Sequence, residues 1–161
     1  MTTGPGYKIS SSNEWYTPKS VFDELNVSFD LDPASSDKVK NVPTKKYFTI
    51  NENGLKQNWK GFVWLNPPYS RNMEPWLNKF IEHKNGIMLL FARTDTKWFH
   101  NIVCKADAIL FKKGRVAFEL EGQDGKGKAI DRNMFIACGN KGIEAIKNIE
   151  GLFVDLRKLN G

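Results

Sequence analysis

The sequence predicts a three-layer α/β sandwich: a reduced, mostly parallel β-sheet with a C-terminal antiparallel hairpin, covered by helices on both faces. Strand-length apolar runs alternate along the chain with segments whose apolar residues recur at helical spacing. The run Gly-Ile-Met-Leu-Leu-Phe-Ala at 86–92 is continuously apolar, which is typical of a strand buried on both faces. We assign one domain to residues 14–161 and expect residues 1–13, rich in Gly, Ser and Thr, to form a flexible arm.

The first predicted helix starts at Thr17 and Pro18. The Thr17 hydroxyl would act as N-cap and Pro18 would take the first helical position. A short strand follows within 27–32 and breaks at Asp32-Pro33, because proline cannot donate to a central ladder and disfavours helix at the preceding residue. The buried stripe of the helix consists of Val21, Phe22 and Leu25.

The middle of the chain supplies two more strands and a clear helix. We expect a short strand at 47–50 and a buried strand at 62–65, which ends at Asn66-Pro67-Pro68. An amphipathic helix follows and stops near Gly86. Its apolar residues lie at i, i+3, i+4, i+7 and i+8: Met73, Trp76, Leu77, Phe80 and Ile81.

The C-terminal third follows the same pattern, with antiparallel pieces added. After the strand at 86–92 comes a helix with Trp98, Phe99, Ile102 and Val103 as its apolar residues. Two strands are expected on either side of 112–115, followed by a glycine-rich charged loop. The last predicted elements are a strand at 133–139, a helix at 143–149 and a strand at 152–156.

Composition narrows the class of protein. The chain has 161 residues and a formal net charge of +6, which permits an acidic partner such as nucleic acid. No apolar run approaches the roughly 20 residues that cross a bilayer, and no signal peptide is recognisable. We therefore expect a soluble cytoplasmic protein without a membrane partner. His83 and His100, the only histidines, lie apart from any nucleophile pattern, so neither a histidine triad nor a metal site is expected.

The loop Asn66-Pro67-Pro68-Tyr69 is the feature that carries chemistry. In an open α/β sheet, ligands bind outside the carboxyl ends of the strands, where this loop emerges. Two prolines fix two φ angles, so the Asn66 amide and the Pro67 carbonyl are held as a pair of hydrogen-bond acceptors. An exocyclic amine has two N–H bonds to satisfy them, and Tyr69 offers a face on which an extruded base can stack. The loop therefore favours methylation of an amine.

A proline-rich turn with Tyr69 packed locally is the structural alternative. A chance match to this pattern in a chain of this length is expected in roughly half a per cent of cases, from average residue usage. Taken alone, the loop would leave the two interpretations about equally supported.

Other segments extend the match. The loop matches the catalytic motif of adenosylmethionine-dependent amino methyltransferases, and the chain resembles the small phage and prophage Dam-type DNA N6-adenine methyltransferase family from about Asn13 to Glu119. The resemblance implies a Rossmann-like methyltransferase fold and a phage- or prophage-encoded enzyme that works in a bacterial cytoplasm. The segments that carry it are NEWYTP (13–18), FDLDPASSD (29–37), NGLKQNW (53–59), WLNPPYS (64–70), TDTKWFH (94–100) and KGRVAF (113–118).

The resemblance implies a site for S-adenosyl-L-methionine. Thr17 and Pro18, with Tyr16 nearby, would lie beside the methionine end, and Asp32 would bind its ammonium. Pro33 and Ala34 would shape that loop. A plain helix cap at Thr17 and a solvent-facing aspartate at position 32 are the structural alternatives.

The adenine of the cofactor would be held by a second segment. Asn53 would accept from its amino group and Leu55 would pack on the ring, although Asn53-Gly54 also fits an ordinary turn. Asn53 stands where the family commonly has an acid. Only 34 positions separate Asp32 from Asn66, so one βα unit is missing or reduced. The ribose contact is left unassigned, with Glu52 as a candidate.

Contacts to double-stranded DNA are expected from downstream residues. Arg93, with Thr94 and Asp95, would either line the base pocket or cap the next helix. Phe118 would offer a second stacking face, or lie in the core. Phosphate contacts are expected from basic side chains that are equally compatible with solvated turns: Lys112, Arg115, Lys126 and Lys128.

The predicted activity is site-specific transfer of a methyl group from S-adenosyl-L-methionine to N6 of a flipped adenine in DNA. The catalytic residues would be Asn66, Pro67, Pro68 and Tyr69, and no metal would be required. An RNA or protein-glutamine substrate, or a DNA-binding relative without catalysis, are the alternatives. The recognition sequence and the oligomeric state, monomer or weak dimer, are left open.

Overall fold

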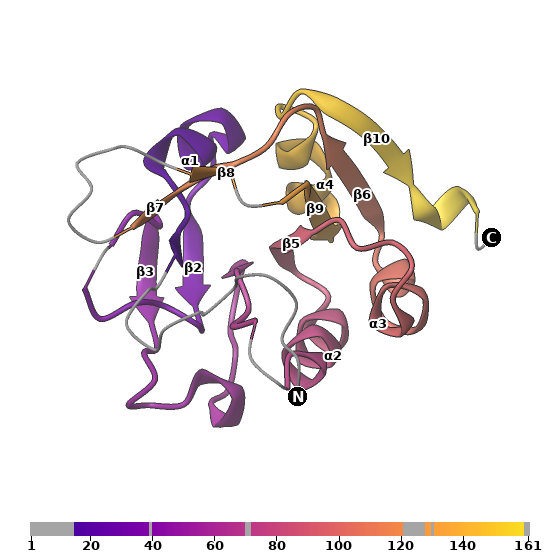
Figure 1. The fold of residues 1–161 in the computed structure, drawn as a ribbon. Coiled ribbons are helices and arrows are strands. Elements are labelled where there is room, and N and C mark those ends of the chain that lie inside the picture. The colour runs from indigo at the N-terminus through magenta and orange to yellow at the C-terminus, as the bar shows by residue number, and fades with distance from the viewer. Residues whose placement is uncertain (1–14, 39, 70–71, 121–127, 130, 160–161) are drawn as a thin grey trace, which may run out of the picture.

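The computed structural model describes residues 15–159 except 39, 70–71, 121–127 and 130, and these residues form two sheets (Figure 1). The larger sheet has the order β10-β6-β9-β5-β4-β2-β3, and the smaller one has the order β1-β7-β8. Strands of the larger sheet are β2 (Phe29–Asp32), β3 (Thr44–Tyr47), β4 (Val63–Leu65), β5 (Gly86–Phe91), β6 (Ala108–Lys112), β9 (Asn133–Cys138) and β10 (Gly151–Asp155). The smaller sheet consists of β1 (Trp15–Tyr16), β7 (Ala117–Leu120) and β8 (Lys128–Ala129).

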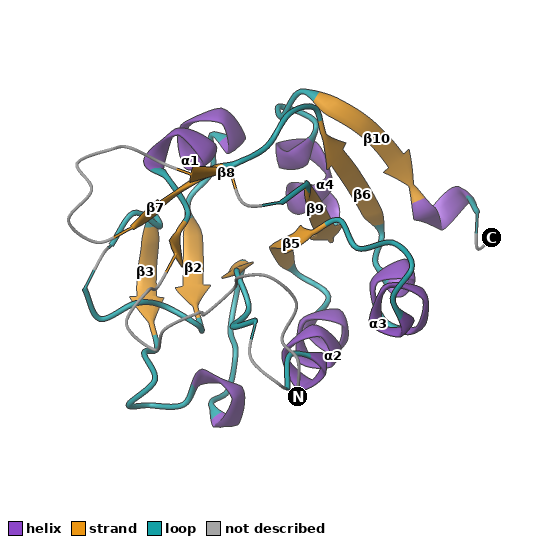
Figure 2. Ribbon diagram, viewed as in Figure 1, coloured by secondary structure: helices purple, strands orange, loops and turns teal. Residues whose placement is uncertain are grey.

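Helices lie on both sides of the larger sheet, as the sequence predicts (Figure 2). The α-helices are α1 (Lys19–Leu25), α2 (Glu74–His83), α3 (Lys97–Asn101) and α4 (Asn140–Ile146). The described residues also form three short 3₁₀ helices, η1 (Gly54–Lys56), η2 (Val103–Lys105) and η3 (Leu156–Lys158). The α/β class and its helix-covered sheet are therefore confirmed.

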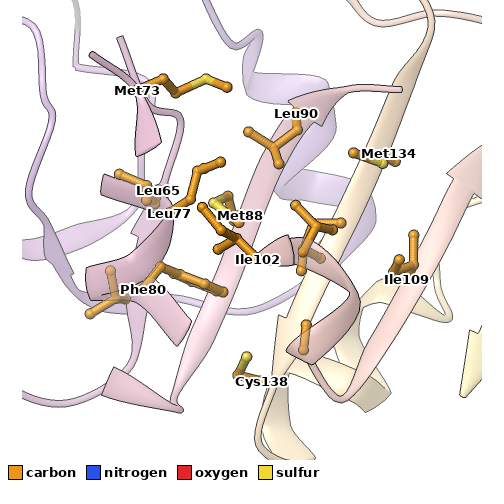
Figure 3. Close-up of a cluster of buried hydrophobic side chains, with 14 of the residues drawn as sticks. Leu65, Met73, Leu77, Phe80, Met88, Leu90, Ile102, Ile109, Met134 and Cys138 are labelled. Atoms are coloured by element: carbon orange, nitrogen blue, oxygen red, sulfur yellow. The ribbon is translucent and has the colours of Figure 1, made fainter. Parts of the chain in front are cut away.

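Side chains of the central strand separate the two cores. Along β5, Met88 and Leu90 belong to the core beneath α2 and α3, whereas Ile87 and Leu89 face the core beneath α1 and α4. Figure 3 shows the first of these cores, with Leu77 of α2 close to β5. Both faces of β5 are buried, as its unbroken apolar sequence predicts.

The sheet is mixed rather than mostly parallel. In the described part of the chain, β3, β2, β4 and β5 are mutually parallel, and β9, β6 and β10 are added by antiparallel pairing. The two predicted strands on either side of Gly114 are present but do not pair with each other, because β6 stays in the larger sheet while β7 leaves it to pair with β1. Local sequence cannot predict this outcome, since β1, one of the two partners of β7, lies about a hundred positions earlier in the chain.

Element boundaries shift in places for identifiable reasons. The helix after β4 ends at His83, with Lys84 in the left-handed conformation, and Gly86 opens β5. A Cβ atom at Gly86 would lie 2.3 Å from the Val63 carbonyl oxygen, so this glycine permits close strand pairing and does not stop the helix. Among the described residues, no helix is long and apolar enough to cross a membrane.

Candidate functional site

The Asn66–Tyr69 loop leaves the carboxyl end of β4 beside the carboxyl end of β2. These two strands are parallel neighbours, with Leu31 paired to Val63. Parallel strands deliver their carboxyl ends to one edge of a sheet, so Asp32 and Asn66 emerge at the same edge. Asn66 is half-buried and Pro67 is buried, which fixes the start of the loop in the body of the protein.

Thr17 fixes the orientation of the Asn66 amide. Asn66 Nδ2 donates to Thr17 Oγ1 at 3.3 Å, and Thr17 itself is only 5% exposed. Because the amide nitrogen is used in this bond, Asn66 Oδ1 points away from Thr17 and keeps its capacity to accept. The prediction that the Thr17 hydroxyl caps α1 is wrong, since Pro18 occupies the cap position and the helix has no side-chain cap.

Thr17 is held from its other side by a residue that sequence reasoning missed. Asn41 Nδ2 donates to the Thr17 carbonyl at 3.0 Å and to Glu119 Oε2 at 3.1 Å. Glu119 is paired with Tyr16 across β7 and β1. Asn41 thus joins the small sheet to the Thr17 segment, which orients the Asn66 amide. No sequence pattern marks it, because its partners lie 24 and 78 positions away.

Asp32 is a buried carboxyl group at the end of β2. It is 3% exposed, and burial raises its pKa to about 7. Hydrogen bonds from Ala34 and Ser35 and the charge of Lys40 lower this pKa, but they offset only part of the effect of burial. A cation bound at this carboxylate would restore the ionised form. The solvent-facing alternative for Asp32 is excluded by its burial.

The two segments predicted to hold the cofactor abut one another. Pro33 is buried and Ala34 packs against the core beneath α2. A Cβ atom at Gly54 would lie 1.8 Å from the Pro33 carbonyl oxygen, so only glycine allows the 53–57 segment to approach this closely. Asn53 is exposed with φ of 53°, and Leu55 is half-buried.

Glu52 closes a tight turn in front of that segment. Its carboxylate accepts from the Thr49 amide at 2.8 Å and from the Thr49 hydroxyl at 2.5 Å. These bonds hold its pKa below the ordinary value. The side chain is therefore already occupied within the turn, and a ribose contact through it stays a prediction.

Tyr69 is locked against the end of β5. Its ring stacks on Phe91, with centroids 4.4 Å apart and planes at 29°, and its hydroxyl accepts from the Phe91 amide at 2.7 Å. Burial raises the pKa of the phenol above its ordinary value. The ring is thus held rigidly at the same edge as Asn66, as a stacking platform would need to be.

Arg93 and Phe118 extend this aromatic contact in two directions. The Arg93 guanidinium lies 5.2 Å from the Phe91 ring centroid and its Nε is 3.3 Å from Asp131 Oδ2. Phe118 is 4% exposed and meets Phe91 edge-on at 6.1 Å. Phe118 belongs to the core beneath α1 and α4, and stacking of its ring on a flipped base stays a prediction. The helix after Arg93 is capped by Thr96, whose side chain accepts from Phe99.

The remaining basic residues do not all gather at the site. Lys112 and Arg115 line a groove of about 280 Å³ beside Pro18 and α1. Lys128 lies in β8, paired to Phe118, and Lys126 and the 1–13 arm lie outside the described residues. Pro18 and Glu119 also line this groove, so Arg115 lies nearer to the Thr17 segment than its position in the sequence indicates.

The donor set fits adenosylmethionine. The buried carboxyl group of Asp32, whose pKa is raised by burial, suits the ammonium of the methionine part of adenosylmethionine. Tyr16, Thr17 and Pro18 are buried beside the hydrogen bond between Asn66 and Thr17. In the described part of the chain, no group of three His, Cys, Asp or Glu residues lies close enough to hold a metal ion.

Comparison with known proteins identifies the family of the chain. Residues 7–139 match the model of the family described as DNA N-6-adenine-methyltransferase (Dam). The chain is 35% identical over 143 residues to the DNA N-6-adenine-methyltransferase of Escherichia phage T1, an alignment that covers 74% of this chain and 58% of that protein. No solved structure matches the chain. The family match spans well over half of the sequence, and the chain belongs to the DNA N-6-adenine-methyltransferase (Dam) family.

Proposed function

We propose that this protein transfers a methyl group from S-adenosyl-L-methionine to N6 of a flipped adenine in double-stranded DNA. One observation carries the proposal. The Asn66 amide is turned by Thr17 so that its oxygen remains an acceptor, at the sheet edge that also presents the buried carboxyl group of Asp32. Family membership and the methyltransferase activity named for the phage T1 relative support this function.

Asn66 and Pro67 would activate the amine. The N6 nitrogen of adenine is a poor nucleophile because its lone pair is delocalised into the ring. Two acceptors, the Asn66 Oδ1 and the Pro67 carbonyl, would bind its two hydrogens and favour a tetrahedral nitrogen with an available lone pair. They would also stabilise the positive charge that develops on this nitrogen. Pro67 and Pro68 would hold both acceptors in place before the base arrives.

Tyr69 would support the flipped base. Its stack on Phe91 and the hydrogen bond from the Phe91 amide leave the Tyr69 ring little freedom. The ring would therefore lose little conformational entropy when a base stacks on it. Stacking of a base on an aromatic ring contributes about 1–3 kcal/mol. Phe118 would act from behind Phe91 as packing support.

Asp32 and its neighbours would bind the cofactor. Adenosylmethionine, when bound, supplies a methyl group on a sulfonium centre. Asp32 would accept from the ammonium, Tyr16, Thr17, Pro18, Pro33 and Ala34 would surround the methionine part, and Asn53 and Leu55 would contact the adenine. Burial of Asp32 fits this role, because a carboxylate with a raised pKa gains most from a cationic partner.

The sheet topology fits a Rossmann-like methyltransferase fold with one unit reduced. The site lies where loops leave the carboxyl ends of the parallel strands β2 and β4, the place at which open α/β sheets bind ligands. β2 and β3 are parallel neighbours, yet the described part of 33–43 contains no helix between them. The missing helix agrees with the short interval between Asp32 and Asn66.

DNA would be bound through Arg93 and the basic side chains around the 112–115 turn, Lys112 and Arg115, with Lys126 and Lys128 nearby in sequence. The chain carries a net charge of +6, and neutralising phosphates makes affinity depend steeply on salt. The phage T1 relative is the longer protein, and this chain spans 58% of it, so its complete set of partners is not carried over.

The decisive experiment uses labelled S-adenosyl-L-methionine with separate DNA, RNA and protein pools, followed by identification of the modified nucleoside. We expect label in DNA as N6-methyladenine. Label in RNA or in glutamine would replace the substrate in this proposal. DNA binding without any label, while cofactor binding is also absent, would identify a relative that has lost catalysis.

A further inference from the structure

Lys79 of α2 holds the segment that is proposed to bind the adenine of the cofactor. Its Nζ donates to the Leu55 carbonyl at 2.7 Å and to the Gln57 carbonyl at 2.5 Å. Helix α2 starts at Glu74, shortly after the Asn66–Tyr69 loop. A single side chain therefore connects the helix that follows the catalytic loop to the 53–57 segment.

Two other side chains bond to the same segment. Trp59 Nε1 donates to the Gly54 carbonyl at 2.8 Å, and Gln57 Nε2 donates to the Glu52 carbonyl at 2.7 Å. The Lys79 ammonium also lies 5.2 Å from the Trp59 ring centroid. The contacts of Lys79 are thus charged, and those of Trp59 and Gln57 are neutral, so Lys79 makes the strongest hydrogen bonds to this segment.

The segment held by Lys79 lies directly against the Asp32 loop. Gly54 touches the Pro33 carbonyl oxygen so closely that no Cβ atom would fit. A shift of the 53–57 segment by an ångström would open this contact. It would also move Asn53 and Leu55 away from the position at which they could meet the adenine.

The chemistry of Lys79 fits a structural clamp better than a solvated surface charge. The side chain is half-buried, and partial desolvation lowers the pKa of its ammonium. A desolvated ammonium is retained where carbonyl oxygens replace its hydration, and two such oxygens are present here. Neither oxygen belongs to a carboxylate, so the bond strength will not depend on the titration of a partner.

We propose that Lys79 is a positioning residue that fixes the 53–57 segment against Pro33 and thereby sets the affinity for S-adenosyl-L-methionine. This inference rests on the proposed function of the site. Lys79 acts through the backbone and touches neither the base nor the methyl group. Its loss will weaken cofactor binding and leave the rate of the saturated enzyme nearly unchanged.

The test compares Lys79→Met, Lys79→Arg and Lys105→Met with the parent protein. Methionine keeps the aliphatic stem and removes the donors, arginine retains donors for both carbonyls, and Lys105 is an exposed lysine of η2 that serves as the matched control. Calorimetry with S-adenosyl-L-methionine gives the Kd, steady-state assays give KM and kcat, and hydrogen exchange reports on residues 53–57 without cofactor.

For Lys79→Met we expect Kd and KM to rise about tenfold, the effect of losing one charge-assisted hydrogen bond, with kcat within about twofold. Exchange should accelerate at the Lys56 and Gln57 amides, which bond within η1, and not in β5. Lys79→Arg should recover most of the affinity, and Lys105→Met should match the parent in every measurement.

Two results would overturn the inference. One is an unchanged Kd with unchanged exchange in Lys79→Met, and the other is a fall in kcat at unchanged Kd. If Lys79→Met fails to fold, a Lys79→Arg protein with parental thermal stability and tenfold weaker binding would equally contradict it. A parent protein that binds no S-adenosyl-L-methionine would instead refute the proposed function, so the two failures are distinguishable.

Discussion

The two halves of the larger sheet differ in what they bury. Around the ends of β2 and β3 the interior contains Thr17, Asp32 and Thr49, three of the four buried polar or charged side chains of the described residues. The antiparallel half around β9 buries every residue of that strand, and all except Asn133 are apolar. Buried polar groups are destabilising unless they are partnered. Thr17 and Thr49 have hydrogen-bond partners, so the cost in the parallel half falls on Asp32, whose pKa is raised by burial. In the antiparallel half, Asn133 Nδ2 is the one buried side-chain nitrogen or oxygen of the described residues without a hydrogen-bond partner, and the rest of β9 is apolar.

The largest effect expected from this comparison is on the antiparallel side. Phe135 of β9 is 0% exposed, and Phe135→Ala should lower the free energy of unfolding by about 3–5 kcal/mol because of the cavity it leaves. Denaturant unfolding measures the loss, and methylation per folded molecule at low temperature should be close to normal. A loss of activity without a loss of stability in Phe135→Ala would show that the antiparallel half also contributes directly to the site.

The next largest effect is expected in the parallel half, where a substitution should lower activity and leave stability nearly unchanged. Asn66→Ala removes an acceptor for the developing charge, and the rate of methylation should fall by about 100- to 1000-fold. Asn66 is half-buried at the sheet edge, so thermal unfolding and cofactor affinity should be nearly those of the parent. Single-turnover kinetics and calorimetry on the same samples provide the check. Retention of full activity would reject the proposed role of the amide.

Asp32→Asn is expected to improve stability while removing cofactor binding. The folded pKa of about 7 lies above the unfolded value of 3.8, so the folded state retains a proton that the unfolded state loses as the pH rises between them. This group therefore lowers stability progressively from about pH 4 to pH 7, and the penalty is complete above it. The amide removes the penalty. Unfolding free energies should differ little at pH 4 and by roughly 2–4 kcal/mol at pH 8.

The same substitution has a cofactor-dependent control. S-adenosyl-L-methionine should raise the melting temperature of the parent protein at pH 8 and leave that of Asp32→Asn unchanged, because the variant lacks the carboxylate that would bind the ammonium of the cofactor. Binding to the parent should weaken as the pH falls below 7. If the Asp32→Asn variant were less stable than the parent at pH 8, a positive charge of the protein itself would already stabilise the Asp32 carboxylate in the absence of cofactor.

The smallest expected effect concerns Tyr69. Tyr69→Phe keeps the ring on Phe91 but leaves the Phe91 amide without its acceptor, at a cost to stability of about 1–3 kcal/mol. Methylation should be largely retained, whereas Tyr69→Ala should lose most of it. Equal rates for the two variants at a temperature where both are folded would exclude a stacking role.

Elements with one-dimensional patterns could be predicted from the sequence, and pairings between distant segments could not. The apolar run of β5 and the helical spacing of α2 each imply their own burial, and both were predicted correctly. The partner of β7 depends instead on Trp15 and Tyr16, about a hundred positions earlier. Glycine at 114 gives the expected turn, with φ of 74°, but does not determine whether the chain returns to the same sheet.

The candidate site shows the same limit. Asn66 and Asp32 could be found because they stand next to prolines at strand ends. Asn41 and Lys79 act through backbone carbonyls more than 20 positions away, and a donor to a carbonyl leaves no pattern in the residue types on either side. Thr17 stands where a helix cap is expected, and this pattern predicted a hydrogen bond from the first turn of α1. In the structure, its hydroxyl instead accepts from the Asn66 amide.

The contact at Asn41 has a consequence for any attempt to exchange the small sheet between relatives. The strands β7 and β8 leave the larger sheet and pair in a small sheet with β1, although Phe118 of β7 is buried in the core beneath α1 and α4 (Figure 1). In addition, the amide nitrogen of Asn41 donates both to Glu119 of the small sheet and to the Thr17 carbonyl. A graft from a relative would therefore need a compatible acceptor at position 119, because without it Asn41 would no longer tie the grafted sheet to the Thr17 segment, which bonds to the Asn66 amide.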